Sequence, residues 1–146
     1  MAGSPAAADK RSIELEYDLA FSPEKVWRAL TQADLLARWL MPNDMVPKVG
    51  HKFRLETDPA PGFDGFVHCE VLEVVPPRRL KLTWRGGPLD TVVTWTLTPT
   101  SAGTRLKVEQ DGFLVDQAGW AYEGAKYGWQ KYFGQMLPHF LKEEMP

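Results

Sequence analysis

Residues 120–141 read WAYEGAKYGWQKYFGQMLPHFL, and the apolar residues in this stretch recur at the spacing of an α-helix. At about 100° per residue, the large apolar side chains fall in one stripe along the helix. The stripe consists of Tyr122, Trp129, Phe133, Met136, Leu137 and Phe140. So much aromatic area needs a wide surface to cover it. The stretch therefore predicts a long C-terminal helix packed on a sheet, and this pairing decides the fold.

Four residues interrupt this helical pattern. Gly124, Gly128 and Gly134 each weaken a helix interior by about 0.5–1 kcal/mol relative to alanine. Pro138 has no N–H to donate and its ring clashes with the preceding turn. We therefore expect a kink or an early end of the helix at Pro138.

The chain ahead of this helix provides the sheet, because several of its segments alternate between apolar and polar residues. Alternation with a period of two is the pattern of a half-buried strand. Turns rich in glycine and proline separate the later segments, which favours consecutive antiparallel hairpins. The six predicted strands cover residues 13–21, 49–57, 66–75, 80–85, 91–98 and 104–110.

Two short helices are predicted between the first and second strands. Ser22 is suited to cap the first helix, and Pro23 and Glu24 are suited to its first turn. The second covers residues 33–40, where Met41-Pro42-Asn43-Asp44 ends it. Together these elements predict an α+β fold, in which a curved antiparallel sheet of about six strands wraps around the long C-terminal helix.

The length of 146 residues is that of one domain, which we expect over residues 12–144. Residues 1–11 are expected to be a disordered tail, and they lack the pattern of a secretory signal peptide. No stretch of the sequence approaches the length needed to cross a bilayer. The single cysteine, Cys69, excludes an intramolecular disulfide. We therefore expect a cytoplasmic protein with no membrane partner.

Charge and motif content exclude several function classes. Lys and Arg are scattered among acidic residues at a net charge of −2, so no nucleic-acid partner is expected. His51, His68 and His139 lie far apart and lack ligand spacing with Cys69, so no metal site is expected. No glycine-rich phosphate motif is present, and we expect no cofactor.

The inward-facing side chains of the strands and helices either fill a core or line a cavity, and both interpretations stay open for each residue. The candidate cavity residues are Trp39, Phe53, Leu55, Cys69, Val71, Trp84, Val93, Trp95, Leu97, Val108, Trp129 and Phe133. No catalytic residue is named among them. We expect the cavity between Trp84 and Trp95 on neighbouring strands and Trp129 and Phe133 on the helix.

The strand over residues 66–75 has two different faces, because neighbouring side chains point to opposite sides. One face carries Phe66, His68, Glu70 and Leu72, and the other carries Val67, Cys69, Val71 and Glu73. The second face is more apolar and is predicted to point inward. A bulge near Leu72 would reverse the assignment on one side of it.

Several short motifs occur in a fixed order between residues 13 and 141. They are SPEKVWRALT at 22–31, Arg38-Trp39, EVVPPRRL at 73–80, Thr83-Trp84, GTRL at 103–106, Gly112-Phe113 and Gly128-Trp129. In these motifs the chain resembles the AHSA1-like (activator of Hsp90 ATPase homologue) branch of the START/Bet v 1-like (SRPBCC) superfamily. The resemblance implies a helix-grip fold, a cavity for a small apolar molecule and a link to the stress response. In this fold Trp39 either plugs the core or borders the cavity entrance.

The sequence departs from this family in two respects. The co-chaperone that gives the branch its name carries a further N-terminal domain, and we expect no such domain within these 146 residues. Hsp90 is therefore only a secondary candidate partner. Where the family often ends its last strand with a Thr-His-Ser type sequence, this chain has Glu109-Gln110-Asp111.

Three functions remain open. The first is non-enzymatic binding of a small hydrophobic or amphipathic molecule in the cavity, by a monomer or a homodimer. The second is an enzyme of the polyketide cyclase/dehydratase kind, which needs two or more facing titratable groups in the cavity. The third is a chaperone-associated interaction module, which needs a large apolar patch on the outer sheet. Few inward ionisable residues can be named, which favours binding.

Overall fold

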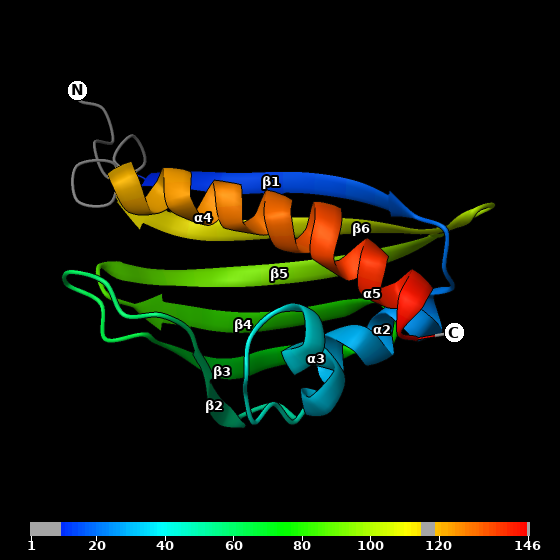
Figure 1. Cartoon of the computed structure of the whole chain (residues 1–146), viewed down its shortest axis with the longest axis horizontal. Coiled ribbons are helices and arrows are strands. Elements are labelled where there is room, and N and C mark those ends of the chain that lie inside the picture. The colour runs from blue at the N-terminus through cyan, green and yellow to red at the C-terminus, as the bar shows by residue number, and fades with distance from the viewer. Residues whose placement is uncertain (1–9, 115–118, 146) are drawn as a thin grey trace.

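The computed structural model describes residues 10–114 and 119–145 (Figure 1). The N-terminal half contains β1 (Lys10–Leu19), α2 (Pro23–Thr31), α3 (Ala33–Trp39), β2 (Lys52–Glu56) and β3 (Phe66–Val75). The C-terminal half contains β4 (Arg79–Gly86), β5 (Leu89–Thr100), β6 (Gly103–Leu114), α4 (Gly119–Lys131), the π-helical turn η1 (Tyr132–Met136) and α5 (Leu137–Glu143).

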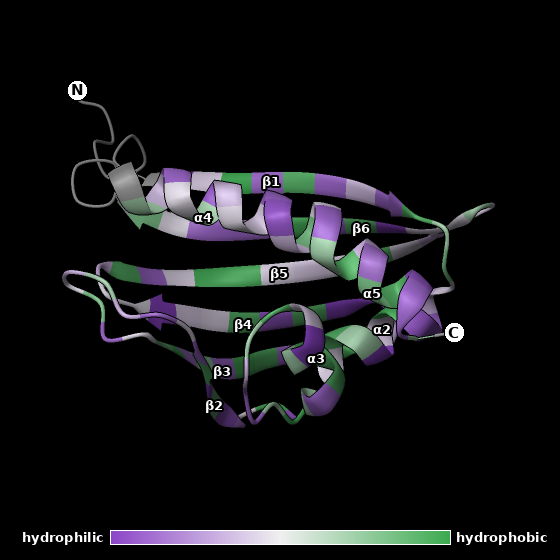
Figure 2. Ribbon diagram, viewed as in Figure 1, coloured by the Kyte–Doolittle hydropathy of each residue, from purple (hydrophilic) through white to green (hydrophobic). Residues whose placement is uncertain are grey.

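The strands form one six-stranded sheet in the order β1-β6-β5-β4-β3-β2, with every neighbouring pair antiparallel. The C-terminal helical segment lies across one face of this sheet, and α2 and α3 cover the end of the same face (Figure 1). Hydrophobic and hydrophilic residues alternate along the strands (Figure 2). The predicted α+β helix-grip architecture is confirmed.

Some predicted boundaries need correction. The tail predicted over residues 1–11 is wrong for Lys10 and Arg11, which belong to β1 and pair with Leu114 and Phe113, and the rest of that prediction lies outside the described residues. Lys10 and Arg11 are both charged, so they show no alternation of apolar and polar residues. Only their pairing with β6 reveals this end of the strand. The second strand starts at Lys52 and not at Val49, which is 63% exposed.

Strand β3 contains a bulge at Leu72. Val71 pairs with Leu82 and Glu73 pairs with Lys81, so one extra residue lies in β3 between these pairs. Val67, Cys69 and Val71 are buried as predicted. The inward position predicted for Glu73 is wrong, because the bulge reverses the faces beyond it, and Val74 packs against the core in its place.

The C-terminal helix continues through Pro138 to Glu143, so the predicted early end is wrong, but a π-helical turn interrupts the helix directly before the proline and the helix changes direction there (Figure 1). In η1 the N–H of Leu137 donates to the carbonyl of Tyr132, five residues back. Pro138 then stands in the first turn of α5, where a missing N–H is tolerated. The π-helical turn also shifts which side of the helix faces the sheet. Met136, which belongs to the predicted apolar stripe, is therefore 40% exposed.

Candidate ligand-binding site

The four aromatic rings expected around a cavity pack against one another. The ring centres of Trp84 and Trp129 lie 4.9 Å apart, and those of Trp129 and Phe133 lie 5.5 Å apart. Trp95 joins them at 5.4 Å from Phe133 and 6.3 Å from Trp129. These rings fill the space between the middle of the sheet and the helix, so the prediction of a cavity between them is wrong. A different pocket lies beside them.

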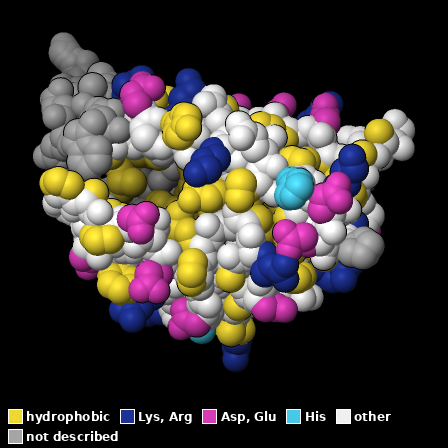
Figure 3. Space-filling model, in the orientation of Figure 1, with side chains coloured by type: hydrophobic (Ala, Val, Ile, Leu, Met, Phe, Trp, Pro, Cys, Tyr) yellow, Lys and Arg dark blue, Asp and Glu magenta, His cyan; other side chains and the backbone are white. Residues whose placement is uncertain are grey.

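A pocket of about 280 Å³ opens between α4, the ends of β3–β5 and the loop that follows β2. Figure 3 shows a hollow with hydrophobic side chains at its base on this part of the surface. From the helical segment it is lined by Ala121, Gly124, Ala125, Gly128, Trp129 and Tyr132. From the sheet and loops it is lined by Met41, Thr57, Ala60, Phe63, Val67, Trp84, Gly86, Pro88 and Leu89.

Small residues on α4 create this space. Ala121 lies three and four residues before Gly124 and Ala125, and Gly128 lies four and three residues after them, so these four residues share the side of the helix that borders the pocket. A Cβ atom added to Gly124 or Gly128 would meet no other atom within 4 Å. The pocket is therefore volume that larger side chains on α4 would occupy.

The loop between β2 and β3 closes the opposite side of the pocket with Phe63. A Cβ atom on Gly86 of β4 would lie 2.9 Å from the Phe63 ring, and one on Gly87 would lie 3.2 Å from the Phe63 Cβ. Only residues without side chains let the ring approach the β4–β5 turn this closely. Both pocket walls thus depend on glycines.

A chain of buried hydrogen bonds holds the two tryptophans of the pocket wall. The indole N–H of Trp129 donates to Gln110 Oε1 at 2.7 Å, and Gln110 Nε2 donates to Thr91 Oγ1 at 2.9 Å. The Thr91 hydroxyl donates to the backbone carbonyl of Trp84 at 2.8 Å. Buried polar groups are costly unless paired, so this chain fixes the orientation of the Trp129 ring.

Sequence reasoning gave Gln110 no role. It stands where the family often has a histidine. The sequence does contain one sign of its role, because Gln110 is a polar residue on the inward face of β6, in step with Leu106 and Val108. Its partner Trp129 lies 19 residues away in the sequence. Helical and strand periods cannot show such a contact.

Of the twelve candidate cavity residues, Trp84 and Trp129 line the pocket. The other ten pack in the buried core and do not line it: Trp39, Phe53, Leu55, Cys69, Val71, Val93, Trp95, Leu97, Val108 and Phe133. Trp39 plugs the core, since its indole N–H donates to the Ala29 carbonyl and its ring contacts Phe133. The glycines and alanines of the pocket were missed, because a small residue adds nothing to a hydrophobic pattern.

The pocket offers little acid–base chemistry. Tyr132 is the only lining residue with an ionisable side chain among the residues that the structure describes. Within residues 10–114 and 119–145 no group of three His, Cys, Asp or Glu side chains could hold a metal ion. The arrangement can surround an apolar molecule but supplies no pair of facing titratable groups.

Cys69 is expected to react slowly with thiol reagents in the folded protein. It is buried, and burial raises the pKa of its thiol to about 12. Because the thiolate is the reactive form, labelling by Ellman's reagent at pH 8 should follow unfolding, while urea-unfolded protein should react at once. Stability should also fall as pH rises from 9.0 towards 12, where only the unfolded chain loses the proton. Rapid labelling of native protein would contradict the inward position of Cys69.

No helix in the described part of the chain combines the length and the apolar character that a membrane crossing requires.

A curved six-stranded antiparallel sheet that grips a long helix, with an apolar pocket between them, defines the helix-grip class of protein. The chain belongs to the family of activator of Hsp90 ATPase homolog 1-like proteins, because the model of that family matches residues 20–142. The resemblance inferred from the sequence motifs is therefore confirmed.

Three solved structures place the chain among its relatives. Protein MLL2253 from Mesorhizobium loti is 44% identical, with a TM-score of 0.80 over 87% of this chain and 94% of that chain. DynU16, a protein of the dynemicin biosynthetic locus, is 26% identical, with a TM-score of 0.74 over 94% of this chain and 49% of DynU16. Protein BH1534 from Bacillus halodurans is 27% identical, with a TM-score of 0.71 over 84% of this chain and 91% of that chain. A search of curated protein sequences finds no match.

Proposed function

We propose that this protein binds a small, flat, hydrophobic or amphipathic molecule in the pocket beside Trp84 and Trp129. The observation that carries the proposal is the apolar space under α4, where Gly124 and Gly128 face no neighbouring atom. Apolar pockets with aromatic walls favour apolar guests. The relative DynU16 belongs to a biosynthetic locus, which fits a small-molecule ligand.

We expect affinities in the micromolar range. A dissociation constant of about 1 μM corresponds to roughly −8 kcal/mol. Burial of about 300 Å² of apolar ligand surface supplies that amount at about 25 cal/mol per Å², before the cost of association. The pocket is open on one side, so part of any ligand stays in contact with water.

The two alternative functions have less support. The enzyme hypothesis needs facing titratable groups, and the described pocket residues include only Tyr132. The interaction-module hypothesis needs an apolar outer surface on the sheet. On β1, β5 and β6 most outward residues are charged residues and threonines, with Val92 as an apolar exception: Glu14, Glu16, Asp18, Val92, Thr94, Thr96, Thr98, Arg105, Lys107 and Glu109. Among the described residues these three strands offer a partner such as Hsp90 little apolar surface, and on β3 only Leu72 and Val75 are exposed apolar residues.

Gly128→Leu is expected to weaken ligand binding by more than about tenfold, because the new side chain occupies the pocket. The fold should be retained or stabilised by about 0.5–1 kcal/mol, since leucine favours a helix interior over glycine. The measurement is titration with a panel of flavonoids, sterols and fatty acids, followed by tryptophan fluorescence.

Gln130→Leu is the matched control, because Gln130 is exposed on the same helix and does not line the pocket. It adds the same side chain and should leave binding unchanged. Equal affinity of wild type and Gly128→Leu for every ligand that binds would place binding elsewhere and overturn the proposal.

A further inference from the structure

Lys131 lies next to a residue of the apolar pocket, Tyr132. Lys131 follows Gly124 by seven residues and Gly128 by three, so at about 100° per residue it lies on the side of the helix that carries both glycines. Its Nζ lies 5.8 Å from the centre of the Tyr132 ring, and Tyr132 lines the pocket. At this distance the ring attracts the ammonium group weakly, which favours its position next to this wall of the pocket.

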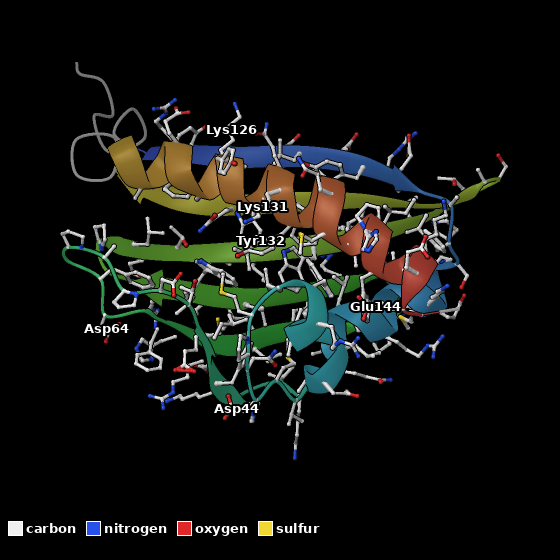
Figure 4. All side chains as sticks on the ribbon, viewed as in Figure 1. Asp44, Asp64, Lys126, Lys131, Tyr132 and Glu144 are labelled. Atoms are coloured by element: carbon white, nitrogen blue, oxygen red, sulfur yellow. The ribbon has the colours of Figure 1, made fainter. Side chains whose placement is uncertain are left out.

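The charge of Lys131 is available to a ligand. The side chain is exposed, and none of the ion pairs among the described residues involves it. Figure 4 shows Lys131 and Tyr132 on the side of the helix towards the middle of the sheet, with Lys126 on the opposite side. Among the lining residues that the structure describes, none carries a charge that would neutralise the ammonium group.

The apolar interior determines how a charged ligand would enter. An anionic group buried beside Trp84 and Trp129 would lose its hydration without a partner, which is costly. The same group at the mouth keeps contact with water and gains the ammonium of Lys131. The pocket therefore orients an amphipathic anion with its apolar part inward.

We propose that the ligand is an amphipathic carboxylic acid, with its flat apolar body in the pocket and its carboxylate held at the rim by Lys131. This inference rests on the proposed function and deepens it by naming the class of ligand. It assigns Lys131 as a specificity-determining residue that distinguishes the acid from a neutral compound with the same body.

The test compares pyrenebutyric acid with pyrenebutanol, which share the apolar body and differ in the head group. Wild type should bind the acid about threefold to tenfold more tightly, as expected for a charge-assisted contact at a partly exposed site. Lys131→Met should remove this preference and leave the affinity for the alcohol unchanged. Added salt should reduce the preference in wild type, because it screens the exposed charges.

Lys126→Met is the matched control, since Lys126 lies on the same helix about half a turn away from Gly124. It loses the same charge and should keep the preference. A preference that survives in Lys131→Met would overturn the inference, while loss of binding of both compounds in Gly128→Leu would still support the pocket. Failure of both compounds to bind wild type would overturn the inference, and failure of the panel of flavonoids, sterols and fatty acids as well would overturn the proposed function.

Discussion

Phe133→Ala is expected to lower the free energy of unfolding by about 3–5 kcal/mol, the usual cost of truncating a buried aromatic side chain. Phe133 is 0% exposed and its ring contacts Trp39, Trp95 and Trp129. Its removal leaves a cavity where the sheet, the C-terminal helix and α3 meet. Urea denaturation of wild type and variant measures the difference.

Met136→Ala provides the control for this prediction. Met136 lies in the same π-helical turn but is 40% exposed, so its truncation should change stability by less than about 0.5 kcal/mol. If Phe133→Ala melted within about a degree or two of wild type, the shift would be too small for a buried core residue of a domain this size. That result would show that this face of the helix does not pack on the sheet.

Trp129→Ala should be similarly destabilising, by about 3–5 kcal/mol, for two reasons. It removes a large buried ring that contacts Trp84 and Trp95. It also leaves Gln110 Oε1 without the indole N–H that it accepts. Trp129→Phe keeps most of the ring and should cost about 1–3 kcal/mol, the penalty of one unsatisfied buried group.

A double-mutant cycle isolates the hydrogen bond. Gln110→Leu alone leaves the indole N–H of Trp129 unpaired, and the variant with both Trp129→Phe and Gln110→Leu leaves neither group unpaired. The double variant should therefore be more stable than the sum of the two single changes predicts, by at least about 0.5 kcal/mol. Additive losses, measured by the same urea denaturation, would show that the bond contributes nothing to stability.

The candidate site was predicted from the sequence only in part. Trp84 and Trp129 were expected at the cavity and line the pocket, because each is a large apolar residue on the inward face of its element. Trp95 and Phe133 have the same local pattern and pack in the same cluster, but they do not line the pocket. All four are large aromatic residues on the inward face of a strand or helix. Only their positions in the folded protein distinguish the two that line the pocket from the two that lie in the core.

The π-helical turn shows a second limit of local reasoning. Pro138 disfavours a helix interior, because it lacks an N–H and its ring clashes with the preceding turn. No feature of the surrounding sequence predicts the π-helical turn. The buried residues Leu137, Phe140 and Leu141 hold the following segment on the core. Tertiary packing therefore overrides the local preference, and the backbone adapts in η1.

By itself the sequence determined the order of the elements, the inward face of each strand up to the bulge at Leu72, and the need for a sheet to cover the last helix. These are local properties, because the period of apolar residues along the chain decides which face is buried. Tertiary structure decided where the pocket lies, how Gln110 reaches Trp129, and that Phe63 packs on Gly86. A pocket is space left empty by small residues among distant neighbours, and no single segment of the chain contains it.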